Sequence, residues 1–273
     1  MIEVAGRFSL RLSVTVVLLC VVSAVSGVLV GASFFARTTS TLQTTTAFNN
    51  INGTRTATVI GTVENAYLLT NGSLVVTYRA GGYDVLAFGT GFLCAPSHDE
   101  QAWGPVATNQ SVVLRTNLGE NLTEGTSCGF FVTPNSNNAP IVDMKVYPKV
   151  AAAIPSPGGL NLTSASLEIV LNRVCTTVGL LNNNTFCYNP IHVTVALKNS
   201  GASPITSIII ETIGVGTIPN QSFLYGGVPV SPSNPVPPKA VALLDEEGLT
   251  GSSFVFCATF QSGSAASIYV VFQ

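Results

Sequence analysis

The chain has 273 residues and a formal net charge of -2, and only 9% of its residues are charged, against about 25% in an average soluble domain. Hydrophobic residues make up 47% of the chain, so it can bury a core and does not have the composition of a disordered protein. Its 11 basic residues form no run that would neutralise phosphates, which excludes a typical nucleic-acid-binding protein.

The first predicted element is an apolar amino-terminal segment, residues 1–36. Arg7 and Arg11 precede an uncharged run from Val14 to Ala36, a pattern typical of a secretory signal peptide. Two cleavage sites are acceptable, Val22-Ser23-Ala24 and Val30-Gly31-Ala32. The run also reaches the length of about 20 residues that a membrane helix requires. The segment is therefore either a cleaved signal peptide or a retained apolar helix, which would be a membrane anchor or would pack in a filament core.

Beyond residue 37 the sequence predicts β-strands throughout. Residues 64–70 and 73–79 are joined by Asn71-Gly72, the dipeptide typical of a β-hairpin with a type I′ turn, in which both central residues need a positive φ. Residues 191–198 alternate between apolar and polar, which places the odd positions toward a core. The other predicted strands are 54–61, 83–93, 110–116, 126–133, 140–147, 164–179, 204–215, 252–261 and 265–272.

Short strands separated by Gly, Pro and Asn turns predict an all-β protein, with one large or two small immunoglobulin-like β-sandwiches. A Pro- and Gly-rich linker, residues 148–160, is expected to divide a first domain, 51–147, from a second, 161–273. Residues 228–239 contain five prolines and are predicted to form an extended surface loop in polyproline geometry, with binding of a Pro-recognising partner as the alternative.

N-glycosylation acceptors are spread over the exported part of the chain. They are Asn52, Asn71, Asn109, Asn121, Asn161, Asn183 and Asn220. Glycans at these sites would hydrate a surface that Thr, Ser, Asn and Gly cover in place of charged residues. The alternative is that these asparagines are ordinary turn residues. Behind an export signal, the acceptors predict an extracellular protein at the cell surface.

The cysteines fit an oxidising compartment. Cys175 and Cys187 flank a predicted hairpin tip and are expected to pair, and Cys94 with Cys128 is the second predicted disulfide. On the chain-entropy model the two bridges would contribute about 3 and 4 kcal/mol. Cys257 lies in an apolar strand pattern and is expected to be a buried thiol.

Candidate catalytic and metal-binding groups are few. His98-Asp99-Glu100 beside Trp103 could bind a cation or ligand, and Asp245-Glu246-Glu247-Gly248 could hold a hard cation such as Ca²⁺, although both patterns are also typical of solvated turns. His192 has no nucleophile motif beside it. No motif of a hydrolase, metalloprotease or phosphate-binding loop occurs. We therefore expect no enzymatic activity, no cofactor and no metal.

The layout of the chain resembles that of surface-filament subunits of thermophilic archaea. The resemblance rests on the apolar segment, on the Thr/Ser-rich stretch Arg37–Phe48 and on the sequon-dense β region that follows. It implies a homopolymer of pilin-like or thread-like type. In a pilin-like filament the apolar helix packs in the filament core, whereas in a thread-like filament an amino-terminal strand completes the sheet of the next subunit.

The resemblance therefore predicts a structural subunit of an extracellular filament or cell-surface coat that polymerises through its amino-terminal segment. Residues 37–50 are then an extended linker or a donor strand, with Leu42 and Phe48 as the groove-filling residues of a donor. The expected partners are copies of the chain itself, N-linked glycans and, through residues 1–36, the membrane. The alternatives are a secreted or membrane-tethered binding glycoprotein, such as an adhesin or archaeal virion surface protein, and, least favoured, an extracellular hydrolase.

Overall fold

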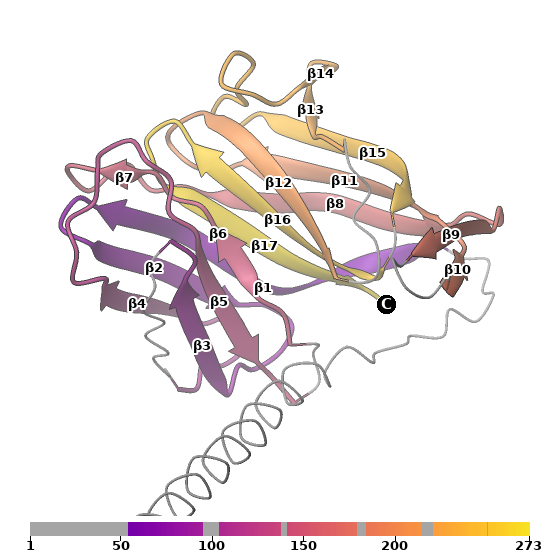
Figure 1. Ribbon diagram of the computed structural model, residues 1–273, viewed down its shortest axis with the longest axis horizontal. Coiled ribbons are helices and arrows are strands. Elements are labelled where there is room, and N and C mark those ends of the chain that lie inside the picture. The colour runs from indigo at the N-terminus through magenta and orange to yellow at the C-terminus, as the bar shows by residue number, and fades with distance from the viewer. Residues whose placement is uncertain (1–53, 95–103, 138–140, 179–183, 214–220, 250) are drawn as a thin grey trace, which may run out of the picture. The chain divides into compact units, whose positions relative to one another are not determined.

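The structure is a computed structural model that describes residues 54–94, 104–137, 141–178, 184–213, 221–249 and 251–273 (Figure 1). Within these residues the chain is all β, without a helix, which confirms the predicted class. The strands are β1 (Arg55–Leu69), β2 (Ser73–Ala80), β3 (Ala87–Phe92), β4 (Ser111–Asn117), β5 (Phe130–Asn135), β6 (Met144–Val146), β7 (Val150–Ala151), β8 (Leu160–Ile169), β9 (Val174–Val178), β10 (Asn184–Tyr188), β11 (Ile191–Asn199), β12 (Ile205–Ile213), β13 (Leu224–Tyr225), β14 (Val228–Pro229), β15 (Val241–Leu249), β16 (Ser253–Phe260) and β17 (Ala265–Phe272).

Three sheets are formed in the described part of the chain. The largest has 12 strands in the order β12-β16-β17-β1-β8-β11-β15-β13-β14, with β2 and β7 attached to β1, and β4 attached to β2. β3, β5 and β6 form a second sheet, and β9 and β10 form a two-stranded ribbon. Figure 1 shows the 12-stranded sheet curling, so that β8, β11 and β15 lie in a layer distinct from β16, β17 and β1.

β16 and β17 are buried along their entire length because a core packs on each of their faces. Val255, Cys257 and Tyr269 belong to a first core, shared with β1, β2 and the β3-β5-β6 sheet. Phe254 and Phe256 belong to a second core, shared with β8, β11 and β15. Alternate side chains of a strand point to opposite faces. The near-continuous apolar sequence of these strands therefore follows from their central position between two cores.

β1 is a single strand of 15 residues where the sequence predicts two. Its pairing with β17 shifts register between Val59 and Gly61 and again between Val63 and Ala66. A β-bulge adds an unpaired residue and breaks the strict alternation of side chains. This break in the alternation explains why residues 54–61 and 64–70 look like separate strands.

The hairpin at Asn71-Gly72 is confirmed, but its predicted turn type is wrong. Gly72 has φ +78°, while Asn71 is not among the residues with positive φ. The Gly72 N–H donates to the carbonyl of Leu69 at 2.9 Å. This geometry fits a type I turn followed by a left-handed glycine, the arrangement of hairpin loops longer than two residues.

The alternation predicted for residues 191–198 is confirmed, whereas the Pro-rich segment differs from its prediction. Residues 191, 193, 195 and 197 are buried in the second core. Within the Pro-rich segment, Val236 is completely buried and its backbone exchanges two hydrogen bonds with Ile205. Residues 228–239 therefore include an anchored residue and are not only an extended surface loop.

The predicted division at residues 148–160 stays a prediction. Residues from Asn52 to Gln273 form one compact unit, and strands from both sides of the predicted linker share a sheet, since β1 pairs with β17 from Ala57 to Ala66. The predicted linker itself contains β7, which pairs in parallel with the end of β1.

Candidate functional site

The most distinctive feature of the fold is the divergence of β1 from β8. These neighbouring strands pair only at Arg55 with Leu167 and at Thr56 with Ser166. Further along, β1 takes β2 as its partner on that side, and the N–H groups of Gly81 and Gly82 close the junction by donating to β1 carbonyls at 2.9 and 2.8 Å. The two strands therefore separate beyond their paired end, and the chain approaches β1 again just before β8, where the Gly158 N–H donates to Asn65 Oδ1 at 2.9 Å.

The edge of β8 that faces this gap pairs with no other described strand between Leu160 and Ala165. Successive residues of a strand direct their backbone groups to opposite edges. Two hydrogen bonds between the β8 and β11 segments show which residues direct their backbone groups toward β11. Val170 N–H donates to Pro190 C=O at one end, and Ser200 N–H donates to Gly159 C=O at the other, with a bulge in the pairing between them. The residues whose backbone groups point away from β11, toward the gap, are then Leu160, Leu162 and Ala165.

A groove of about 730 Å³ follows this gap. We call it the β1–β8 groove. Its floor is apolar and belongs to the second core: Ala57, Val59, Leu160, Leu162 and Ile268. Its rim is polar and includes Thr58, Thr62, Glu64, Arg79, Thr108, Asn109, Asn161, Thr163 and Lys198. A side of the core is thus reachable through an opening bordered by hydroxyl, amide and charged groups.

Charge contributes little to the rim. Arg79 Nη1 lies 3.6 Å from Glu64 Oε1, and the two side chains are 53% and 37% exposed. Exposed pairs of this kind contribute at most about 1 kcal/mol and are screened by salt. Because this pair is nearly neutral as a unit, Lys198 is the remaining charged residue among those that line the groove.

The described glycosylation acceptors Asn71, Asn109, Asn121 and Asn161 all lie on the surface with exposed side chains. Two of them line the β1–β8 groove: Asn161 belongs to β8, and Asn109 lies in the loop before β4. Asn52, Asn183 and Asn220 lie outside the described residues. Every acceptor that the structure describes is therefore accessible, as glycosylation requires, although its modification stays a prediction.

The hairpin tip at Asn71 is also chemically compatible with a glycan. The Asn71 Oδ1 accepts a hydrogen bond from the backbone N–H of Ser73 at 3.0 Å. An N-linked sugar attaches to the amide nitrogen and leaves this oxygen as an acceptor. The turn is therefore stabilised by the atom that glycosylation does not alter.

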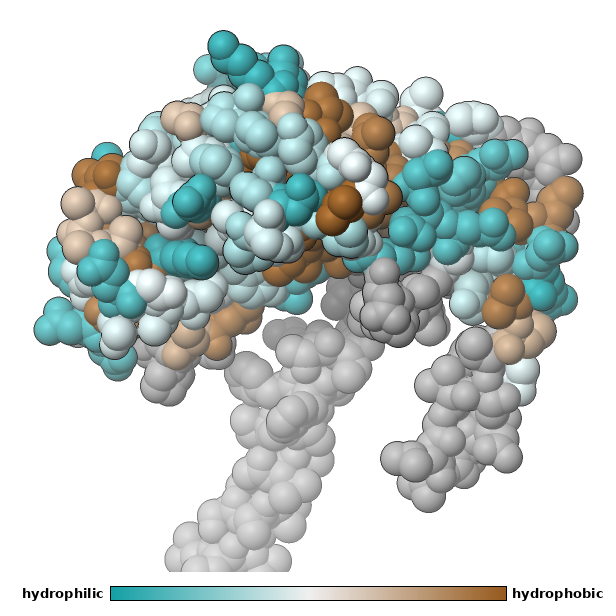
Figure 2. Space-filling model, turned by 90° about the horizontal axis from the view of Figure 1, so that it is seen from above, coloured by the Kyte–Doolittle hydropathy of each residue, from teal (hydrophilic) through white to brown (hydrophobic). Residues whose placement is uncertain are grey.

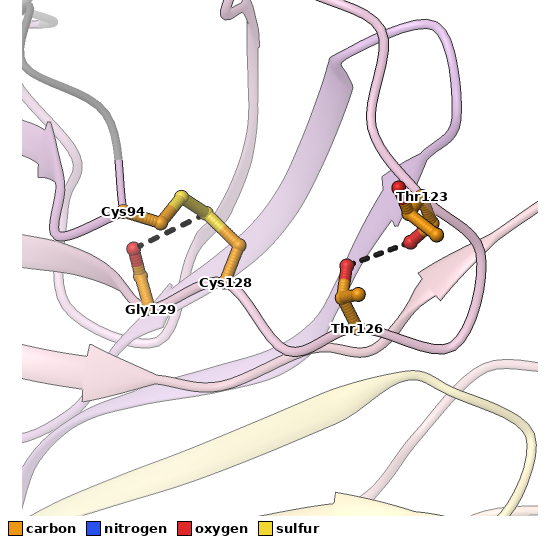
Figure 3. The surroundings of a disulfide bond; sticks show 5 residues. All are labelled: Cys94, Thr123, Thr126, Cys128 and Gly129. Atoms are coloured by element: carbon orange, nitrogen blue, oxygen red, sulfur yellow. Dashed lines mark hydrogen bonds between the residues drawn. A yellow bond between two sulfur atoms is a disulfide. The ribbon is translucent and has the colours of Figure 1, made fainter.

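The structure contains both predicted disulfides, Cys94–Cys128 and Cys175–Cys187. Cys175 lies directly opposite Cys187 in the β9–β10 ribbon. The other bridge joins the loop after β3 to the segment before β5 (Figure 3), where Thr126 Oγ1 donates to the Thr123 carbonyl at 2.6 Å. Each bridge thus holds together strands that are already neighbours, and the pair of bridges suits an oxidising compartment.

Cys257 is a free and buried thiol, as the sequence predicts. Burial in the first core raises the pKa of this thiol to about 12. The neighbouring Tyr147 is also shifted, since desolvation and the carboxylate of Glu211, which accepts its hydroxyl hydrogen bond at 3.1 Å, raise its pKa to about 12.

We expect native Cys257 to resist alkylation at about pH 8.5, where an exposed thiol is half ionised. The raised pKa keeps the thiol protonated, and burial denies access to the reagent. Peptide mass spectrometry after iodoacetamide treatment, with and without guanidinium chloride, measures this directly. Equal labelling in the two conditions would contradict the buried position.

Of the candidate catalytic groups, His192 has the clearest environment. Its Nε2 lies 2.7 Å from Asp245 Oδ1, and Thr194 Oγ1 donates to the same oxygen at 3.1 Å. The hydrogen bond with His192, followed by that from Thr194, lowers the pKa of Asp245. The hydroxyl thus bonds the carboxylate and not the imidazole, so these groups do not form the nucleophile–base–acid chain of a hydrolase.

The other candidates gain no support as a metal site. The structure places Asp245–Gly248 in β15 and not in a turn, and the alternation of a strand directs Glu246 away from Asp245 and Glu247. Among the described residues no group of three or more His, Cys, Asp or Glu side chains is arranged to hold a metal ion. His98, Asp99, Glu100 and Trp103 lie outside the described residues.

A second, smaller hollow of about 390 Å³ lies on the face of β3 and β5. Phe131 and Ile141 supply apolar surface, and Thr133 Oγ1 donates to Asp143 Oδ1 at 2.6 Å on its border. An aromatic ring beside hydroxyl and carboxylate groups can contact a small polar ligand. Sequence reasoning found neither this hollow nor the β1–β8 groove, because both depend on strands that are distant in the chain.

The predicted assembly residues Leu42 and Phe48, like the whole of residues 1–53, lie outside the described residues. In the part of the chain that the structure describes, there is no helix with the length and apolar character needed to span a membrane. Comparison of the chain with protein-family models, with curated proteins and with solved structures gives no match.

Proposed function

We propose that the protein is a structural subunit of an extracellular filament or cell-surface coat and polymerises through its amino-terminal segment. One observation carries the proposal. Leu160–Ala165 of β8 pair with no described strand on the side away from β11, beside a groove whose floor is part of the hydrophobic core. An exposed strand edge is a ready template for pairing with another chain. A subunit that assembles by strand addition needs such an edge and such a floor.

The surface supports the same proposal. On the face seen in Figure 2, weakly polar residues dominate and hydrophobic groups form small separate clusters. One apolar group lies on the short strands at the sheet end and on β15: Leu224, Val228, Val241 and Leu243 are all exposed, and Leu224 pairs directly with Leu243. Few charges have to be desolvated when copies of such a surface pack side by side.

The proposed location is the cell surface, outside the membrane. Two disulfides and four exposed glycosylation acceptors suit that compartment. In this proposal residues 1–36 are the export signal or a retained apolar helix, and the two layers around the second core belong to an immunoglobulin-like sandwich.

A secreted binding glycoprotein is the second candidate, favoured by the hollow on β3 and β5. Its combination of Phe131 with Thr133 and Asp143 offers an apolar platform beside polar groups. The groove on β8 is the larger feature and contacts the core directly, so assembly is the better-supported function.

Intact-mass spectrometry and electron microscopy of the protein as exported by its cells test the proposal. We expect a mass that exceeds that of the polypeptide by attached glycans, and filaments or a regular coat in material shed from the surface. The mass also identifies the amino-terminal residue and so distinguishes a cleaved signal from a retained helix. A monomer that stays monomeric at high concentration would contradict the assembly function and favour the binding glycoprotein.

A further inference from the structure

We propose that the hollow on the outer face of β3 and β5, which we call the β3–β5 hollow, binds a neutral saccharide through one sugar ring. Such a site goes beyond the proposed assembly function, because a filament subunit and a soluble glycoprotein could both carry it. Two features of the hollow carry the proposal: a partly exposed aromatic ring beside a bare stretch of strand, and polar groups with unused hydrogen-bonding capacity.

The hollow exists because β3 carries little side-chain bulk on its outer face. Buried and outward positions alternate along β5. The outward Phe131 lies opposite Gly91 of β3. A Cβ atom at Gly91 would lie 2.5 and 2.6 Å from two carbon atoms of the Phe131 ring, so the ring lies across this glycine. One pair further along, Thr133 lies opposite Gly89, where the nearest atom to an added Cβ would be the Cβ of Thr133 at 3.6 Å. The floor beside the ring is therefore bare backbone with open space above it.

The wall of the hollow offers hydrogen-bonding groups at its border. Thr133 Oγ1 donates to Asp143 Oδ1 at 2.6 Å. Within the described residues, Asp143 Oδ2 and the side-chain amide of Asn135, which also lines the hollow, have no hydrogen-bond partner. A carboxylate accepts hydrogen bonds from hydroxyls, and an amide both donates and accepts them. Hydroxyls on neighbouring carbons of a sugar ring can bond both groups, and the bonds to an ionised carboxylate are among the stronger ones.

The aromatic ring and the charge of the hollow select the class of ligand. One face of a sugar ring presents mainly C–H groups, which can pack flat on the apolar face of Phe131. Asp143 is the one charged residue among the described residues that line the hollow, so an anionic ligand would be repelled. Lys145, opposite Phe131 on β6, lies 3.5 Å from the carboxylate of Glu211, which compensates its charge. A purely apolar ligand would desolvate the carboxylate without replacing its hydrogen bonds. A neutral ring with several hydroxyls satisfies both halves of the site.

The site is small and is held at both ends. The Cys94–Cys128 bridge joins β3 to β5 at the end where Phe131 lies. At the other end, Leu86 N–H donates to the Asn135 carbonyl at 2.8 Å. Strands fixed in this way lose less entropy when a ligand binds. The volume of about 390 Å³ is near the lower limit of small-ligand sites, about 300–1,000 Å³, and suits a terminal sugar residue better than a long oligosaccharide.

Saturation-transfer NMR of the exported, full-length protein tests the site, with the methyl glycosides of glucose, galactose, mannose and N-acetylglucosamine as probes. We expect transfer to at least one glycoside. Asp143→Asn should raise the dissociation constant about tenfold, the effect of losing one hydrogen bond to a charged group. Gly89→Val should abolish binding, because its side chain fills the open space and a β-branched residue suits a strand. The matched control is Asp84→Asn, since Asp84 also accepts a hydrogen bond from a threonine hydroxyl but lies outside the hollow. Circular dichroism checks that each variant is folded.

Binding that is weakened by Asp143→Asn and Gly89→Val but kept in Asp84→Asn supports the saccharide site. If the folded wild-type protein shows no transfer to any of the four glycosides, the site is wrong. Transfer that neither hollow variant weakens places the sugar elsewhere and also overturns the site, as does an equal loss in the Asp84→Asn control. Electron microscopy measures filament formation separately. A failure of sugar binding therefore leaves the assembly function standing, and a failure of assembly leaves the saccharide site standing.

Discussion

A chain that lacks residues 38–48 is expected to be exported and folded but to remain monomeric. The deletion removes the segment with Leu42 and Phe48 and leaves residues 54–273 intact, including both cores and both disulfides. The β1–β8 groove is then present in every copy, but no copy has the amino-terminal segment that would add a strand. Size-exclusion chromatography with light scattering measures the oligomeric state, and circular dichroism checks the β-fold.

Two controls identify what the deletion removes. Replacing residues 38–48 by eleven Gly and Ser residues keeps the spacing to β1, and we expect the same loss of polymer, because the apolar side chains are missing. Phe48→Asp should disrupt assembly far more than Gln43→Asp, since only position 48 shares a face with Leu42. Polymerisation of the deleted chain at the wild-type level would refute the role of this segment.

Gly81→Ala is expected to destabilise the folded protein strongly, whereas Gly82→Ala is expected to be nearly neutral. A Cβ atom at Gly81 would overlap the carbonyl oxygen of Val59 and would lie 2.8 Å from the carbonyl carbon and oxygen of Ile60. These are backbone atoms of β1, which cannot move without disturbing its pairing with β17. Overpacking typically costs about 1–3 kcal/mol, and the overlap with backbone atoms places this substitution at the upper end of that range.

The neighbouring glycine provides a matched control. At Gly82 the nearest atom to an added Cβ is the flexible Cγ2 of Thr58 at 3.1 Å, and the next is 3.6 Å away. A small shift of that side chain accommodates the methyl group, so the change in the free energy of unfolding should stay within about 0.5 kcal/mol. Urea denaturation of both variants measures the difference. Equal denaturation midpoints for the two variants would contradict the prediction, because they would show that β1 shifts at little cost to accommodate a Cβ atom at position 81.

Because Gly81 also lines the β1–β8 groove, its substitution has a second consequence. Displacement of β1 at Val59 moves part of the groove floor, so we expect Gly81→Ala to impair assembly even under conditions in which the variant is still folded. Gly82→Ala should assemble normally, although it lies on the same rim. Comparing the two variants therefore tests whether the position of β1 beside Gly81 affects assembly through the β1–β8 groove.

Local sequence signals predicted the strands well where one face of a strand is buried and the side chains alternate. Residues 191–198 follow this pattern, and the dipeptide Asn71-Gly72 marks a real hairpin. The prediction was wrong where a tertiary contact disturbs the local rule. Bulges in β1 interrupt the alternation, and the left-handed Gly72 closes a different turn from the one the dipeptide usually forms.

The Cys175–Cys187 pairing could be inferred from spacing, because these cysteines are separated by 12 positions and flank a predicted hairpin tip. Cys94 and Cys128 are 34 positions apart with β4 between them, so spacing alone does not fix that second pairing. The charged cluster at residues 245–248 was harder to interpret, since a run of acidic residues is typical of a turn. Its place in β15 follows from pairing with β11 over the whole strand, which the local sequence does not reveal.

The sequence by itself determined the all-β class, most strand positions, the Cys175–Cys187 disulfide and the buried state of Cys257, because each depends on local alternation, turn residues or short spacing. Only the tertiary structure decided which strands share a sheet, why β16 and β17 are buried on both faces, and where the sheet opens. The rung between Arg55 and Leu167 joins strands that are far apart in the chain. Such pairing depends on how the two cores pack, which the local sequence does not reveal. β1 contributes residues to both cores and changes its partner from β8 to β2 along its length, and the groove lies where this change occurs.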